Sequence, residues 1–238
     1  MNKFTSLFAV AAALLLGNQC IAQSRVVQSF NDDWKFYKAN NSTFFTDFEN
    51  GQKYFESQSQ WTKLEVWEDV TLPHTYNRTD MQTDRNFFEG KAVYTKTFSV
   101  DPASKDKRTF IKFEGVGAIA KLYINDNFIG EHKGGYSMFT YEITNSVNYD
   151  KPNTITVIAD NGSRKDIIPI NQFLFPVYGG IYMPVHLITT NKTSFLVTDR
   201  AAPGIQIRQQ NVSAKNADIE VSANWRPKRR QHNRWSYG

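Results

Sequence analysis

Hydrophobic and polar residues alternate with a period of two along much of this chain, and the clearest case lies near its middle. The side chains of 110–113 alternate, and Leu122 and Ile124 repeat two apart, as in half-buried strands. Residues 125–127, Asn-Asp-Asn, then interrupt the run, and these residue types tolerate the left-handed backbone of a tight hairpin. The pattern predicts a strand, a corner at 115–117, and a hairpin.

The same region contains a pair of glycines, Gly134 and Gly135, just before Tyr136 and Phe139. Glycine is favoured where two backbones approach closely, and large aromatic side chains anchor loops into cores. We therefore expect a close backbone approach at the glycines, followed by an aromatic anchor in the core.

Other stretches of the chain repeat this alternation, with turn signals between them. Residues 25–37 are predicted to be a first strand and turn, and further strands are predicted at 65–72, 94–100, 154–159 and 181–188. The segments 40–60, 77–90 and 160–178 read as loops. Short strands separated by turns, with almost no helical period, are typical of all-β sandwiches. The expected fold of 23–189 is therefore an all-β sandwich.

Beyond Thr190 the pattern changes. Three further strands are predicted at 194–197, 205–207 and 219–223, but a second sandwich needs about seven strands. We therefore expect 190–225 to be an incomplete second sandwich. Residues 226–238 show no alternation, and two interpretations remain open: a solvated basic tail, or a segment translated out of frame.

The N-terminus has the three parts of a secretory signal peptide. Lys3 supplies the positive charge, 7–17 is an apolar run, and 20–22 offers small residues at the cleavage positions, with cleavage expected after Ala22. The apolar run is too short for a membrane span, and no later stretch is a candidate. A lipoprotein signal at Cys20 is the less favoured alternative, because Gln19 stands where a small residue is needed. The predicted location is secreted or periplasmic, and removal of 1–22 removes the only cysteine.

The net charge of +5 does not indicate a nucleic-acid partner. Five of the positive charges lie in 226–238, and Lys3 lies in the predicted signal peptide. The residues between them are close to neutral, so no basic face spans the fold.

Sequence motifs for catalysis are absent. No pair of carboxylates is forced together, as a glycosidase would need, and no two of the four histidines have metal-ligand spacing. No nucleophile elbow, phosphate loop or dinucleotide fingerprint occurs. We therefore predict no catalytic residues, no metal and no cofactor in this chain.

Two predicted loops combine the residue types that recognise sugars. Planar hydrogen-bonding groups bind hydroxyls, and aromatic faces bind the apolar side of the ring. The alternative for Asp160 and Asn161 is that they only cap a strand end through side-chain to backbone hydrogen bonds. The candidate sugar-binding residues are Asp84, Arg85 and Asn86 in the first loop, with Phe87 beside them, and Asp160, Asn161 and Asp166 in the second, which also holds Arg164.

Five segments in order resemble the start of glycoside hydrolase family 2, the family of β-galactosidases, β-glucuronidases and β-mannosidases. They are LPHTY at 72–76, the strand with Tyr94 and Phe98, the stretch 113–139, NTITVIADN at 153–161 and GGIYMPVHL at 179–187. The resemblance implies a jelly-roll, galactose-binding-like sandwich followed by the opening of an immunoglobulin-like sandwich. It also implies that Asp160, Asn161 and Asp166 match a DN…D pattern, and that Asn86 matches an Asn before the Gly-x-x-x-Tyr strand.

In that family the sandwich packs against a (β/α)₈ barrel that carries both catalytic glutamates, and the 238 residues contain no counterpart of the barrel. The resemblance therefore implies the non-catalytic, N-terminal part of a β-galactosidase-like hydrolase, inactive alone. Its partners would be a β-linked glycoside and a separately encoded remainder of the enzyme. The alternative is a free-standing carbohydrate-binding or surface-interaction protein.

Overall fold

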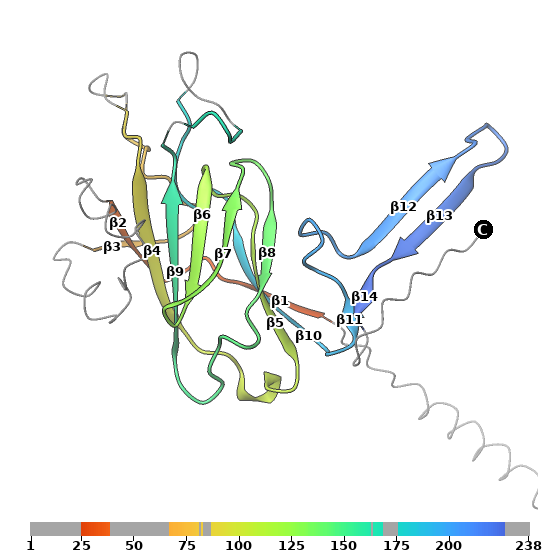
Figure 1. Ribbon diagram of the computed structural model, residues 1–238, viewed down its shortest axis with the longest axis horizontal. Helices are drawn as coiled ribbons and strands as arrows, with labels where there is room; N and C mark the ends of the chain where they lie inside the picture. Colours follow the sequence, from red (N-terminus) through yellow and green to blue (C-terminus); the bar gives the residue numbers. More distant parts are fainter. Residues whose placement is uncertain are drawn as a thin grey trace, which may run out of the picture.

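The structure is a computed structural model, and it describes residues 25–38, 67–80, 82, 87–162, 164–168 and 176–226. Within them the chain is nearly all β, with one short 3₁₀ helix, η1 (Pro102–Ser104). Two antiparallel sheets form the main body, and a two-stranded arm projects from it (Figure 1). The prediction of an all-β sandwich is confirmed.

The larger sheet contains six strands, and its centre is β9. Its order is β3 (Glu68–Val70), β2 (Trp34–Lys38), β4 (Lys91–Phe98), β9 (Asn153–Asp160), β6 (Ile119–Ile124) and β7 (Asn127–Lys133). The register places Tyr94, Val157 and Leu122 in one row across the three central strands, and all three are fully buried. Residues directly opposite on neighbouring strands point to the same face. The apolar positions of the alternating pattern therefore line the inner face.

The smaller sheet has the order β1 (Arg25–Ser29), β10 (Val185–Thr190), β5 (Arg108–Phe113) and β8 (Phe139–Glu142). Its inner face contributes Ile111, Phe113 and Val185 to the same core as the larger sheet. Burying each of these side chains stabilises the fold by about 1.5–3 kcal/mol. Trp34, fully buried between the sheets, donates its indole N–H to the Phe30 carbonyl (2.8 Å), so its polar atom is satisfied.

The central hairpin follows the predicted course. Asn125 and Asp126 adopt positive φ values of 48° and 65° between β6 and β7, as a tight turn requires. The corner before it brings Gly117 opposite Gly180, and a Cβ at Gly117 would lie 2.3 Å from the Tyr178 carbonyl oxygen. This close approach explains why glycine occupies the corner.

The predicted aromatic anchor is half right. Phe139 is buried and stacks on Phe113, with ring centroids 4.9 Å apart. Tyr136 is instead 72% exposed, because the chain turns outward after Gly134, whose φ is +135°. The expectation of a buried Tyr136 was wrong.

Strand β10 begins later than predicted, at Val185 rather than Ile181. Gly180 makes only an isolated bridge, and Pro184 cannot donate a ladder hydrogen bond, so regular pairing starts after the proline.

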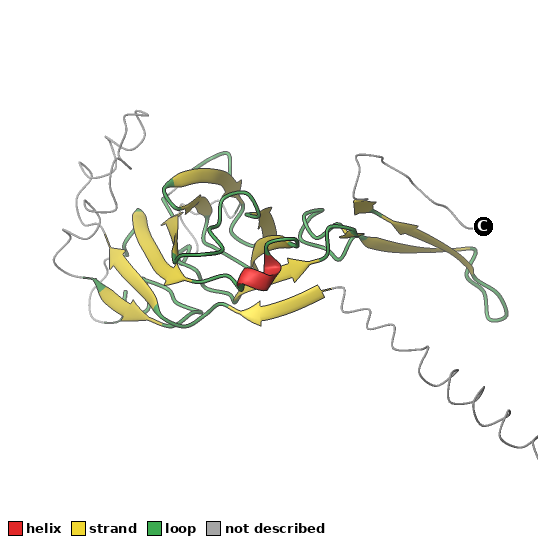
Figure 2. Cartoon of the chain, turned by 90° about the horizontal axis from the view of Figure 1, so that it is seen from below, coloured by secondary structure: helices red, strands yellow, loops and turns green. Residues whose placement is uncertain are grey.

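The C-terminal part of the described chain forms two small sheets. β11 (Ser194–Phe195) pairs with β14 (Trp225–Arg226), and β12 (Ile205–Gln210) pairs with β13 (Asp218–Ala223). Figure 2 shows the β12–β13 hairpin extending away from the sandwich. The predicted signal peptide and the tail after Arg226 lie outside the described residues.

Candidate functional site

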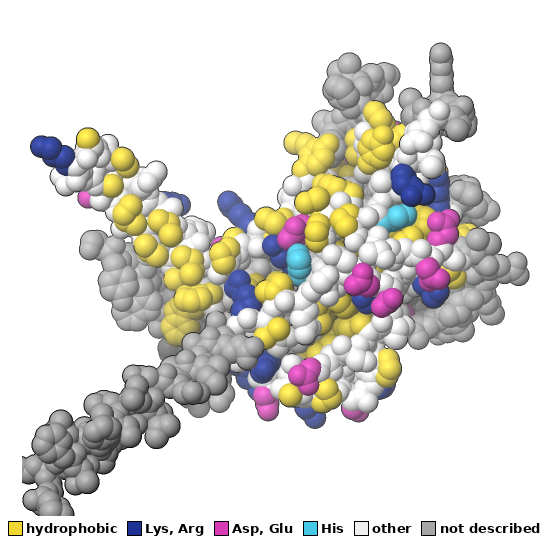
Figure 3. Space-filling view, turned by 180° about the vertical axis from the view of Figure 1, so that it is seen from behind, with side chains coloured by type: hydrophobic (Ala, Val, Ile, Leu, Met, Phe, Trp, Pro, Cys, Tyr) yellow, Lys and Arg dark blue, Asp and Glu magenta, His cyan; other side chains and the backbone are white. Residues whose placement is uncertain are grey.

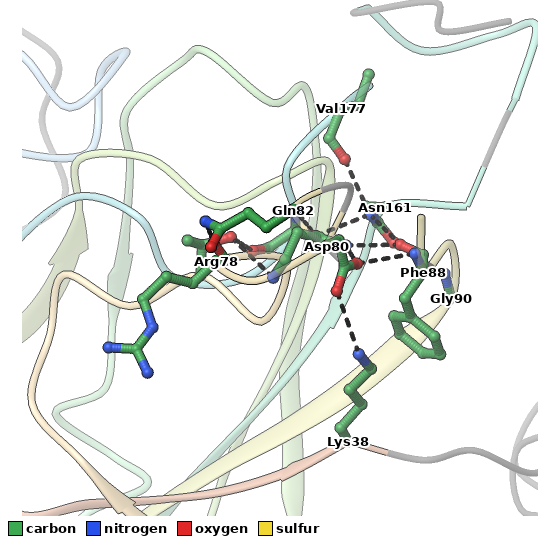
Figure 4. Close-up of polar contacts among 11 residues, drawn as sticks. Lys38, Arg78, Asp80, Gln82, Phe88, Gly90, Asn161 and Val177 are labelled. Carbon is green, nitrogen blue, oxygen red and sulfur yellow. Dashed lines mark hydrogen bonds and ion pairs between the residues drawn. The ribbon is translucent and has the colours of Figure 1, made fainter. Parts of the chain in front are cut away.

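Four chain segments meet at the end of the sandwich where β9 finishes: 74–80, 87–90, 161–162 and 176–180. Two buried asparagines, Asn77 and Asn161, join them, and their exposed fractions are 0% and 3%. Figure 4 shows polar contacts around Asn161 and Asp80. The geometry of this end of the sandwich therefore depends on a few buried amide groups.

Asn77 binds in four directions. Its Nδ2 donates to Asp80 Oδ2 (2.7 Å) and to the Phe88 carbonyl (2.8 Å). Its Oδ1 accepts from the Gly179 N–H (2.7 Å) and from Asn161 Nδ2 (3.3 Å). One side chain thus connects its own turn to three other segments.

Asn161 completes the network from the opposite side. Its Oδ1 accepts from the Gly90 N–H at 2.8 Å. Its Nδ2 also lies 3.0 Å from the Phe88 carbonyl and 2.9 Å from the Val177 carbonyl. In the described structure the Asn161 amide therefore caps the end of β9 and holds the neighbouring loops. This corresponds to the strand-capping alternative given for Asn161 in the sequence analysis.

Asp80 is a half-buried carboxylate in the same network. Its Oδ2 accepts from the Phe88 N–H (2.9 Å), and Lys38 Nζ lies 4.0 Å from its Oδ1. Burial raises the pKa of Asp80, but the hydrogen bonds from Phe88 and Asn77 and the Lys38 charge outweigh it, and the pKa falls below its usual value. Asp80 is therefore held ionised as an acceptor for the loop.

Aromatic side chains of the adjoining core also contact this network. The Tyr76 hydroxyl donates to the Gly90 carbonyl (2.9 Å), and a Cβ at Gly179 would overlap the Tyr76 ring. His74 Nδ1 lies 2.9 Å from the Tyr94 hydroxyl. Burial lowers the pKa of His74 and raises that of Tyr94, so both are neutral near pH 7.

Asp160 faces a different direction from Asn161. It lines a small depression on the outer face of the six-stranded sheet, where its Oδ1 accepts from the Gly162 N–H (2.8 Å). The buried side chains of Ile119 and Ile158 contribute apolar lining, and the remaining lining residues are charged. These are Lys91, Lys121, Glu131 and Arg164.

Asp166 is linked to this depression through Arg164. Two hydrogen bonds of 3.0 and 3.1 Å join the Arg164 guanidinium to the Asp166 carboxylate, and Lys133 Nζ lies 4.0 Å from it. The hydrogen bonds from Arg164 lower the pKa of Asp166. Asp160 and, through Arg164, Asp166 thus belong to one charged surface, whose planar groups can form hydrogen bonds with saccharide hydroxyls.

Of the six predicted sugar-binding residues, the structure brings Asp160 and Asp166 to the same surface and places Asn161 in the buried network. Asp84, Arg85 and Asn86 lie outside the described residues. Among the residues that are described, no group of three or more His, Cys, Asp or Glu side chains is arranged to hold a metal ion. Nor does any helix in that part of the chain have the length and apolarity to cross a membrane.

Sequence reasoning missed Asn77 and Asp80. Their spacing of three residues inside a polar turn was the only available signal, and it is common in turns that have no other role. The contacts with Asn161 and Gly179 span 84 and 102 residues, so only the folded chain reveals them.

Comparisons with known proteins agree with this architecture. The family model described as "Glycosyl hydrolases family 2, sugar binding domain" matches residues 28–191. A β-glucuronidase of Bacteroides fragilis is 41% identical over 157 residues, which cover 65% of this chain and 22% of the relative. A β-galactosidase of Thermoanaerobacter pseudethanolicus is 36% identical over 172 residues, which cover 71% of this chain and 21% of the relative.

Solved structures give the same result. The crystal structure of a putative β-galactosidase from Bacteroides fragilis has a TM-score of 0.74 and 43% identity, over 85% of this chain and 28% of that one. A Bacteroides uniformis β-glucuronidase has a TM-score of 0.70 and 30% identity, over 84% and 22% of the two chains. The chain spans about a fifth of the length of the curated relatives that it matches. Because the family model covers most of the described sandwich, the chain belongs to glycoside hydrolase family 2, of which it carries the sugar-binding domain.

Proposed function

We propose that this chain is the N-terminal, non-catalytic part of a secreted family 2 glycoside hydrolase that acts on β-linked glycosides, in the manner of a β-galactosidase. The observation that carries the proposal is the match of the sugar-binding domain to relatives named β-glucuronidase and β-galactosidase, of which it represents about a fifth. Hydrolysis would then depend on the remainder of the enzyme, supplied on the same or on a separate polypeptide.

The role of the chain in that enzyme is to contact carbohydrate. The surface bordered by Asp160, Arg164 and Asp166 offers carboxylate and guanidinium groups that can form hydrogen bonds. Such planar polar groups suit the hydroxyls of a sugar. Asn161 acts indirectly, by holding the loop that leaves Asp160.

Secretion is the second part of the proposal. It is supported by the basic, apolar and small-residue regions of 1–22. N-terminal sequencing of the protein exported by a bacterial host should begin at Gln23. A mature protein that begins at Met1 would contradict export by this signal.

The test of the main proposal uses the full chain and two readouts. We expect no hydrolysis of p-nitrophenyl β-galactoside or β-glucuronide above the buffer rate, and measurable binding to a β-linked glycan on an array. Hydrolysis by the purified protein would show that the chain itself is catalytic and would contradict the proposal. Absence of binding to every β-linked glycan would remove the carbohydrate-contact role and leave only a structural one.

A further inference from the structure

Asn161, at the end of β9, is followed directly by Gly162. An asparagine before a glycine is prone to deamidation, because glycine has no side chain to hinder attack of its backbone nitrogen on the asparagine Cγ. The pair lies in the polar network that joins four segments of the sandwich (Figure 4). The folded structure therefore controls a reaction to which the local sequence is disposed.

Deamidation breaks one bond of the Asn161 side chain and forms another. The Gly162 nitrogen bonds to the Asn161 Cγ and gives up its proton, and the Nδ2 group takes up a proton and leaves as ammonia. The resulting succinimide ring is opened by water, which leaves either aspartate or isoaspartate at this position. Water is the sole co-reactant, and no oxidant or reductant takes part.

The Asn161 side chain is pinned in the folded chain. Its Nδ2, the leaving group, lies near the Phe88 carbonyl (3.0 Å), the Val177 carbonyl (2.9 Å) and Asn77 Oδ1 (3.3 Å). Its Oδ1 accepts from the Gly90 N–H at 2.8 Å. Forming the succinimide would deprive these buried groups of a partner, which costs free energy. The closed network therefore opposes the reaction.

The attacking nitrogen of Gly162 is restrained as well. Its N–H donates to Asp160 Oδ1 at 2.8 Å, so this hydrogen is directed at a carboxylate two residues back in the chain. The proton that the nitrogen must lose is thus already engaged, and attack requires a rearrangement at both residues of the pair.

Access to Asn161 depends on opening of the structure. In Figure 3 hydrophobic side chains along the projecting β12–β13 arm are open to solvent without any movement. Asn161, by contrast, is 3% exposed, and the segments 87–90 and 176–180 must move away before its side chain can rotate. Local openings of this kind cost less free energy than global unfolding, so a folded population opens repeatedly.

The product of the reaction cannot restore the network. An aspartate side chain is ionised near neutral pH and has no donor, so the Phe88 and Val177 carbonyls would face a carboxylate oxygen in place of an N–H. Isoaspartate would also lengthen the backbone where the Asn161 N–H donates to the Gly90 carbonyl (3.2 Å). A reversible opening thus becomes a permanent one.

We propose that Asn161 is a deamidation site that the folded network protects, and that its conversion to aspartate or isoaspartate permanently releases the loops at the end of β9. The rate in the folded chain then equals the rate in the unfolded chain multiplied by the fraction of chains in which the network is open. The reaction needs no sugar, so the site is independent of whether the sandwich binds carbohydrate.

Peptide mapping by mass spectrometry measures the rate at which Asn161 of the full chain is deamidated at mildly alkaline pH. We expect the rate in native buffer to be at least about tenfold below the rate in denaturing urea. In urea Asn50, the other asparagine that precedes a glycine, is the reference and should convert at a rate similar to that of Asn161.

Two perturbations separate the chemistry from its protection. Gly162→Ala places a methyl group beside the attacking nitrogen and should slow conversion of Asn161 in urea relative to Asn50. Asn77→Ala removes one partner of the network and should raise the rate in native buffer by about tenfold or more. Urea below the unfolding transition should raise the same rate without any substitution, so this arm does not depend on the folding of the variant.

A substitution that reproduces the product tests whether closing is blocked. Asn161→Asp should lower the melting temperature, whereas Asn191→Asp, at an exposed position between β10 and β11, should leave it unchanged. An Asn161→Asp chain as stable as the unsubstituted one would show that the product closes the network normally and would overturn the proposal.

Three further results would overturn it: a rate in native buffer less than about tenfold below that in urea, no conversion of Asn161 in urea while Asn50 converts, or a rate in native buffer that neither Asn77→Ala nor dilute urea raises. The first two would show that the fold protects nothing or that the site does not react, and the third that opening of this network does not limit the reaction.

Discussion

Asn161 at the end of β9 and Asn77 in the turn after β3 lie with Nδ2 and Oδ1 3.3 Å apart, 84 residues separated in the chain and both buried. Each also binds the backbone of the 87–90 segment and of the 176–180 segment. A buried amide that loses its hydrogen-bond partners costs more free energy than an amide exposed to water, so movement of these loops away from the pair is unfavourable. The pair therefore fixes the relative positions of the loops around the candidate site.

Replacing Asn161 with Ala should lower the free energy of unfolding by about 1–3 kcal/mol, because the Gly90 N–H and the Phe88 and Val177 carbonyls lose a buried partner. Urea denaturation followed by tryptophan fluorescence measures the change. Asn191→Ala, at an exposed position between β10 and β11, is the matched control. Equal effects of the two substitutions would show that the network does not stabilise the fold.

Gly179→Ala should be poorly tolerated. A Cβ at Gly179 would lie 1.9 Å from the Tyr76 hydroxyl oxygen, and moving this buried ring would also disturb its hydrogen bond to Gly90. We expect overpacking to lower the free energy of unfolding by about 1–3 kcal/mol. Gly162→Ala serves as the control, since its nearest neighbour is only the flexible Asp160 carboxylate. A Gly179→Ala protein as stable as the control would contradict this packing.

Stability should fall as the pH decreases below about 6.5, the usual histidine pKa. Burial lowers the pKa of His74, with Glu68 opposing this effect and Arg78 adding to it, so in this pH window the unfolded chain binds a proton that the folded chain does not. Burial lowers the pKa of His132 as well, so it contributes in the same direction. The free energy of unfolding at pH 7.5 and 5.5 should differ less in His74→Gln than in the unsubstituted chain. An unchanged difference would show that His74 does not contribute.

Asp160→Ala should weaken carbohydrate binding without affecting the core, because Asp160 is partly buried at the edge of the outer depression and not in the core. Removing one charged hydrogen-bond acceptor should reduce affinity by roughly tenfold or more. Isothermal titration calorimetry with the glycan that binds most strongly on the array gives the ratio of the two affinities. Asp69→Ala, an exposed residue of β3, should leave affinity unchanged. Equal affinities for all three proteins would place the sugar elsewhere.

The strands were largely readable from the sequence, because polar residues such as Lys121, Thr154 and Thr156 separate the inward apolar positions of β6 and β9. The hairpin turn was readable too, since Asn125 and Asp126 are residues that accept positive φ. Tyr136 was misjudged because burial of an aromatic residue next to a glycine depends on which way the turn directs it, and the spacing of residues carries no such information.

The candidate site was only partly predictable. Asp160, Asn161 and Asp166 were identified by residue type, yet the sequence could not show that neighbouring residues 160 and 161 have different environments, one at a surface depression and one buried. Adjacent positions at a strand end point to opposite faces, so a loop packed over one face buries only one of the two. Asn77 joins the site through contacts that no local pattern encodes.

A chimera shows whether this chain can serve as the sugar-binding domain of a family 2 hydrolase. Residues 28–191 would replace the matching segment of the Bacteroides fragilis β-glucuronidase, and hydrolysis of p-nitrophenyl β-glucuronide would be measured. We expect hydrolysis by the chimera and none by the relative without that segment. A chimera that folds with the same melting transition as the intact relative yet hydrolyses nothing would contradict it.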